Sequence, residues 1–131
     1  MFHSVDIKRT DTCLTFVLKR LGILDKYQNL DGVEFIKKFN LEEIENFDNL
    51  QKGDIIVRKS NRNCYKNSIL KIDEKGRTFN GYFDNSYHFM VFEGDAISDF
   101  GYHGIGYYKL DFFDIKNSKS LFYVIRNSDL N

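Results

Sequence analysis

Cys13 and His88 are the two residues of this sequence whose types and surroundings could support nucleophilic catalysis. A cysteine thiol becomes a strong nucleophile when an imidazole and the positive end of a helix stabilise its thiolate. The residues around Cys13 have the character of a helix N-terminus, and His88 begins an apolar stretch typical of a strand. If folding brings the two side chains together, they form the two halves of a thiolate–imidazolium site.

The segment around Cys13 predicts a short helix. Asp11 and Thr12 are both good N-cap residues, because a side-chain oxygen can accept a hydrogen bond from the free amides of the first turn. Gly22 stands where a helix of this length would end. Between these limits apolar residues recur at helical spacing, namely Leu14, Val17, Leu18 and Leu21. Cys13 is therefore expected at the positive end of the helix dipole, which favours the thiolate.

Each of these residues also has a simpler interpretation. A single cysteine in a helix is usually a small core residue without reactivity, and a lone histidine on an apolar strand face is more often structural than catalytic. The second cysteine, Cys64, lies in a polar stretch over residues 60–65, with neither a helix N-terminus nor an apolar frame. We interpret Cys64 as a partly exposed bystander thiol.

Composition narrows the classes of protein to consider. The 131 residues predict a single domain, 1–131, and 42% hydrophobic with 16% aromatic residues is typical of a globular chain. Lys+Arg and Asp+Glu both number 19, so no net charge favours nucleic acid or an anionic membrane as a partner. No N-terminal signal sequence and no segment of membrane-spanning length is evident, and two cysteines make no disulfide framework, so a cytoplasmic location is expected.

The first half of the chain is expected to contain mostly helices. Residues 2–8 alternate loosely, which suggests a short edge strand before the Cys13 helix. Asp31 and Glu34 form a capping-box pattern ahead of a second helix. A third short helix is predicted over residues 41–47 from the spacing of Leu41, Ile44 and Phe47.

From residue 50 onward the pattern changes to strands. Strands are expected after Gly53-Asp54, over residues 87–93, 96–99 and 121–126, and after a Gly-rich turn at 101–106 through residue 110. A hairpin is predicted over residues 69–83, and the tail after Asn127 is expected to be loose. Helices followed by antiparallel strands predict an α+β domain.

Three blocks of this sequence resemble the NlpC/P60 cysteine peptidases. Residues 11–23 look like the family's nucleophile helix, which has an Asp-Cys or Asn-Cys start, an apolar body and a Leu-Gly-Ile-like end. Residues 50–56 resemble its Leu-x-x-Gly-Asp-Leu-Val segment, and residues 88–95 resemble the strand that begins with the catalytic His and ends at a Gly turn. The blocks occur in the family's order and extend over residues 11–110. The resemblance implies a papain-like α+β fold.

The resemblance also implies a function. Cys13 would attack a peptide or amide carbonyl, His88 would serve as base and then acid, and the substrate would be a bacterial cell-wall peptide, with no metal or organic cofactor. The family's third catalytic position, a polar residue on the strand after the His strand, falls best on Asp99, with Ser98 or His103 as alternatives. The sequence departs from the family pattern where Leu14-Thr15 replace the usual Ser-Gly after the cysteine, and where the upstream Tyr has no clear match.

A different class of function remains open. The absence of proline and the abundance of Lys, Asn, Asp, Ile and Phe resemble the product of an AT-rich bacterial or phage genome. The chain could be a phage-encoded or virion-associated enzyme, or it could keep the fold without catalysis and bind a host protein. In the second case Tyr102, Tyr107 and Tyr108 are a candidate contact surface, although ordinary hairpin packing is the simpler interpretation of these residues.

Overall fold

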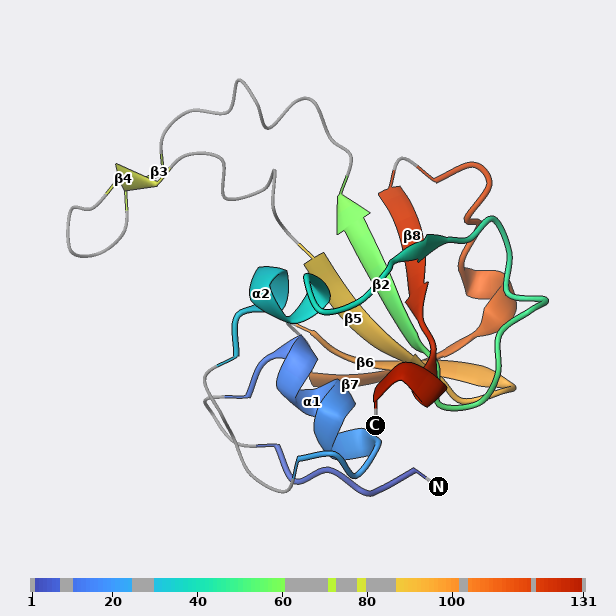
Figure 1. Cartoon of the computed structure of the whole chain (residues 1–131), viewed down its shortest axis with the longest axis horizontal. Helices are drawn as coiled ribbons and strands as arrows, with labels where there is room; N and C mark the ends of the chain where they lie inside the picture. Colours follow the sequence, from blue (N-terminus) through green and yellow to red (C-terminus); the bar gives the residue numbers. More distant parts are fainter. Residues whose placement is uncertain are drawn as a thin grey trace.

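The computed structural model of the chain describes residues 2–7, 11–24, 30–60, 71–72, 78–79, 87–101, 104–118 and 120–130. Six strands form one antiparallel sheet: β1 (Glu42–Glu43), β2 (Ile55–Ser60), β5 (Tyr87–Phe92), β6 (Ala96–Gly101), β7 (Gly104–Lys109) and β8 (Ser120–Ile125). Their order across the sheet is β1-β8-β2-β5-β6-β7, and Figure 1 shows β2 between β5 and β8. The last strand of the sequence therefore lies inside the sheet rather than at its edge.

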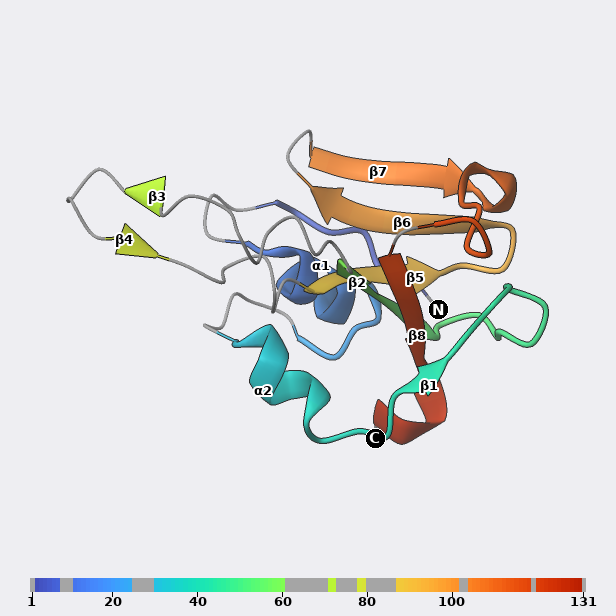
Figure 2. The same cartoon turned by 90° about the horizontal axis from the view of Figure 1, so that it is seen from above.

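Helices occupy the first part of the chain, and short 3₁₀ turns follow the later strands. The helices are α1 (Cys13–Arg20) and α2 (Gly32–Ile36), and the 3₁₀ turns are η2 (Leu110–Phe112) and η3 (Asn127–Leu130). Figure 2 shows β6 and β7 running side by side as a long hairpin. A separate two-stranded sheet pairs β3 (Lys71–Ile72) with β4 (Thr78–Phe79), as predicted for the 69–83 hairpin within its described residues. The arrangement is an α+β fold.

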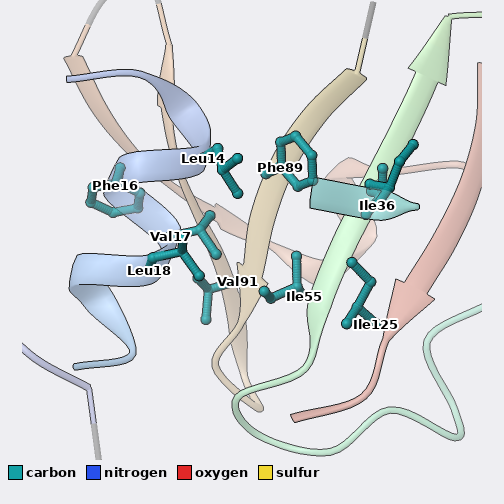
Figure 3. Packing of buried hydrophobic residues seen from close by; sticks show 10 residues of the cluster. Leu14, Phe16, Val17, Leu18, Ile36, Ile55, Phe89, Val91 and Ile125 are labelled. Atoms are coloured by element: carbon teal, nitrogen blue, oxygen red, sulfur yellow. The ribbon is translucent and has the colours of Figure 1, made fainter. Parts of the chain in front are cut away.

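The main core lies between the two helices and one face of the sheet (Figure 3). Leu14, Val17 and Leu18 project from α1 toward Phe89 and Val91 of β5. Strand side chains alternate between faces, so the next residues along β5, Met90 and Phe92, contribute to a second cluster on the opposite face. α1 is thus held against the strand that carries His88.

Residues 41–47 do not form the predicted helix. Glu42 and Glu43 instead pair with β8, and the amide of Ile44 donates to the carbonyl of Phe122. Leu41 packs in the α1-side core, whereas Ile44 and Phe47 pack in the cluster on the other face. The helix-like spacing of Leu41, Ile44 and Phe47 therefore arises because this segment crosses the edge of the sheet and packs on both faces.

The predictions for the two ends of the chain were also wrong. Residues 2–7, the described part of the expected strand 2–8, contain no strand, because His3 bonds to Arg20 at the end of α1. The His3 amide donates to the Arg20 carbonyl at 2.8 Å, and Arg20 Nη1 donates to the His3 carbonyl at 2.9 Å. The tail after Asn127 is not loose but forms η3, anchored by Asn127, whose amide donates to Asp54 Oδ1 at 2.9 Å.

Candidate active site

Cys13 is the first residue of α1. Thr12 caps the helix, since its Oγ1 accepts a hydrogen bond from the amide of Thr15 at 3.2 Å. Of the two candidate caps in the sequence, Thr12 is the one that performs this role. The Cys13 sulfur is half-buried next to the amides of the first helical turn, whose partial positive charge favours a thiolate.

His88 lies on β5 at the point where this strand separates from β6. The pairing of β5 with β6 extends from Phe92↔Ile97 to Met90↔Asp99 and goes no further. Beyond it the backbone of β5 meets the first turn of α1, and the amide of Phe89 hydrogen-bonds the Cys13 sulfur. The His88 side chain also hydrogen-bonds Cys13, so residues 75 positions apart in the sequence meet at the end of this ladder.

Asp99 completes a chain of three polar side chains. Met90 is the partner of Asp99 across the ladder and shares a face of β5 with His88, so Asp99 is a diagonal neighbour of His88. The distance from His88 Nε2 to Asp99 Oδ2 is 2.7 Å. Because Nε2 is engaged by Asp99, Nδ1 is the ring nitrogen left to face the Cys13 sulfur.

The alternatives to Asp99 are separated by the strand geometry. Ser98 pairs with Val91 and is fully buried on the α1 side of the sheet, the face opposite to Asp99. It therefore cannot replace Asp99 beside His88. His103 lies outside the described residues, as do Cys64 and Tyr102.

The three groups affect one another's protonation. Burial alone would lower the pKa of His88, but the hydrogen bonds to Asp99 and Cys13 and the negative charges of both groups raise it to about 9. Burial alone would raise the pKa of Cys13, but the hydrogen bond and positive charge of His88, together with the amides of Phe89 and Leu14, lower it. The arrangement favours a thiolate next to an imidazolium at neutral pH.

Two contacts of this site were not found from the sequence. One is the amide of Phe89, which becomes available to the sulfur only because β5 and β6 separate there. The other is Tyr108, whose hydroxyl interacts with Asp99 from β7. In the sequence, the residue that indicates this contact is Gly106, which lies directly opposite Asp99 in the β6–β7 hairpin. That position becomes apparent only when the register of the hairpin is known.

Across the described ranges, no group of three or more His, Cys, Asp and Glu side chains is arranged to hold a metal ion. Within the same part of the chain, no helix has the length and apolar character needed to cross a bilayer. Comparisons of this chain with protein-family models, with curated proteins and with solved structures found no match.

Proposed function

We propose that this protein is a thiol hydrolase in which Cys13 is the nucleophile, His88 the general base and acid, and Asp99 the residue that orients His88. The observation that carries the proposal is the continuous set of contacts from the Cys13 sulfur through the His88 ring to the Asp99 carboxylate, with the 2.7 Å bond at its far end. These groups come from α1, β5 and β6, which pack against one another around the α1-side core.

The reaction would follow from the protonation states of the pair. The Cys13 thiolate attacks the carbonyl carbon of an amide bond and forms a carbon–sulfur bond, and His88 gives its Nδ1 proton to the departing amine as the carbon–nitrogen bond breaks. A water molecule then gives a proton to His88 and attacks the thioester, which releases the acid and restores the thiolate. As the first residue of α1, Cys13 also has a backbone amide without an intrahelical partner, suited to stabilise the oxyanion.

The substrate class comes from the sequence resemblance. We infer a papain-like fold of the NlpC/P60 type and, with it, a peptide amide of the bacterial cell wall as the bond cleaved. The order of the elements supports this inference, because a helix that begins at the cysteine precedes antiparallel strands that carry the histidine and its partner. A phage-encoded enzyme, acting in the cytoplasm or from the virion, is consistent with the composition.

The first experiment measures the rate of iodoacetamide alkylation of Cys13 against pH. The protein carries Cys64→Ser so that one thiol is followed, and it is compared with the same protein carrying His88→Ala. We expect the thiolate of the first protein to form well below the ordinary thiol pKa of about 8.5, and His88→Ala to raise that pKa. Hydrolysis of cell-wall peptides is then assayed with Cys13→Ala as the inactive control.

The opposite result would favour the second candidate function. An ordinary thiol pKa that does not respond to His88→Ala would mean that the fold serves binding, for example to a host protein. One observation favours that alternative: Phe112 is a large aromatic side chain with 67% of its surface exposed. The alkylation experiment separates the two because only the hydrolase requires the ion pair.

A further inference from the structure

The second oxygen of the Asp99 carboxylate faces β7. Asp99 uses Oδ2 for His88, and its neighbour across the β6–β7 ladder is Gly106, which has no side chain to offer Oδ1. Tyr108 is two residues further along β7 and therefore points to the same face as Asp99. Its ring leans back over the glycine, so that its hydroxyl lies close to the carboxylate without making a full hydrogen bond.

Gly106 is the position that makes this contact possible. A Cβ atom at residue 106 would lie 2.5 Å from the Tyr108 hydroxyl oxygen and 2.7 Å from Asp99 Oδ1. Both distances are too short for a carbon atom, so the two oxygens already occupy the space that any other residue would need. The Gly106 φ angle is not positive, so the requirement for glycine here comes from space and not from the backbone.

The Tyr108 ring is held on its other sides by aromatic side chains. It stacks on Phe112 with 5.0 Å between ring centroids, and Phe113 meets it edge-on at 5.6 Å. Within the described residues no donor meets the buried Oδ1 of Asp99 at full hydrogen-bond geometry, and the Tyr108 hydroxyl interacts with this carboxylate more loosely. The negative charge of Asp99 raises the pKa of Tyr108, which keeps the hydroxyl protonated and able to donate.

We propose that Tyr108 is a positioning residue, which holds the Asp99 carboxylate so that Oδ2 stays directed at His88, and that Gly106 leaves the room for it to do so. The inference rests on the proposed function, since it concerns the same thiolate–imidazolium pair. A carboxylate bound through one oxygen only can rotate, whereas a donor close to the second oxygen restricts that rotation. Tyr108 thus acts on Cys13 through Asp99 and His88.

The test compares Tyr108→Phe with Tyr107→Phe in the Cys64→Ser protein. Tyr107 is the matched control, because it is the adjacent tyrosine on the other face of β7 and 60% of its surface is exposed. The His88 pKa is followed by NMR titration of the ring, and thiolate formation at Cys13 by alkylation against pH. We expect Tyr108→Phe to weaken proton binding at His88 about threefold, the lower end of the range for a hydrogen bond because the contact is loose, and to raise the Cys13 pKa, while Tyr107→Phe changes neither.

A double-mutant comparison distinguishes action through Asp99 from a general loss of structure. In an Asp99→Asn background, Tyr108→Phe should have no further effect on the His88 titration. Gly106→Ala should reproduce the Tyr108→Phe shift. The inference would be overturned if the Tyr108→Phe protein had the wild-type His88 pKa. It would also be overturned if Tyr108→Phe shifted the His88 pKa equally in the protein with Asp99 and in the Asp99→Asn background. Either result would leave the hydrolase proposal standing. An ordinary His88 pKa in the unmodified site would instead overturn both.

Discussion

At the scale of single residues, charge is the central feature of the candidate site. His88 has only 30% of its side chain exposed, an environment that by itself disfavours an imidazolium. The carboxylate of Asp99 at 2.7 Å and the sulfur of Cys13 reverse that preference. The thiolate and the imidazolium therefore stabilise each other, and Asp99 biases the pair toward the charged form. Removing Asp99 should show how much of the His88 charge depends on it.

Asp99→Asn is expected to lower the pKa of His88 from about 9 toward its ordinary value of 6.5, because an amide supplies no negative charge. Because the folded-state pKa is raised, protonated His88 stabilises the fold. This contribution is complete below pH 6.5 and is lost as the pH rises through about 9. Destabilisation by Asp99→Asn should therefore shrink with rising pH across that window. The measurements are an NMR titration of the ring and urea unfolding at several pH values.

Ser98→Ala is the matched control for this prediction, because Ser98 is the adjacent residue of β6 and lies on the opposite face. Its substitution should leave the His88 titration unchanged. A His88 pKa that is the same in the Asp99→Asn and Ser98→Ala proteins would show that the carboxylate does not control the histidine.

At the scale of elements, α1 is short and has capping hydrogen bonds at both ends. After its Thr12 cap it continues for eight residues and ends in a Schellman motif, in which the Gly22 amide donates to the Lys19 carbonyl and the Ile23 amide to the Leu18 carbonyl. Gly22 has a φ of 75°, which glycine adopts without strain. A helix of this length is not stable alone in water, so its packing on β5 and its two ends must together hold Cys13 in place.

Thr12→Ala should reduce the free energy of unfolding by about 1 kcal/mol, the usual effect of losing an N-cap acceptor. The change is measured by urea denaturation at neutral pH. Thr12→Ser retains the hydroxyl that accepts from the Thr15 amide and should remain close to wild type. Equal stability of the alanine and serine proteins would mean that the cap contributes nothing to this helix.

At the scale of the whole molecule, Gly53-Asp54 joins the start of β2 to the end of the chain. The buried Asp54 carboxylate accepts hydrogen bonds from the amides of Gln51 and Asn127, both at 2.9 Å, and from Arg126 Nη1 at 3.0 Å. The Asn127 side chain in turn donates to the Gly53 carbonyl at 3.1 Å. This Gly-Asp pair, one of the motifs behind the family resemblance, thus has a structural role, which is to anchor η3 beside β2.

Asp54→Ala is expected to lower the free energy of unfolding by about 3 kcal/mol, because it leaves several donors without their buried acceptor. Glu42→Ala provides the control, since Glu42 contacts the same Arg126 at 3.3 Å but has 61% of its side chain exposed. Its loss should change stability by less than about 1 kcal/mol. Chemical denaturation of both variants tests this, and comparable losses would contradict the distinction between the buried and exposed partners.

The sequence alone was sufficient for features that depend on neighbouring residues. The cap and the end of α1, the N-cap at Asp31 and the strands that carry His88 and Asp99 all follow from local spacing and turn chemistry. The choice of Asp99 as the partner of His88 also agrees with the structure, because the tight turn at Gly94-Asp95 limits the possible register of β5 and β6.

Only the tertiary structure decided features that depend on distant pairing. Residues 41–47 have a helical spacing but bind the edge of β8, which lies some 80 residues later in the sequence. Tyr108 reaches Asp99 only because the β6–β7 register puts a glycine between them, and Cys13 meets His88 only where two strands separate. Local preference is set by adjacent residues, whereas these contacts depend on which surfaces meet when the sheet and the helices pack.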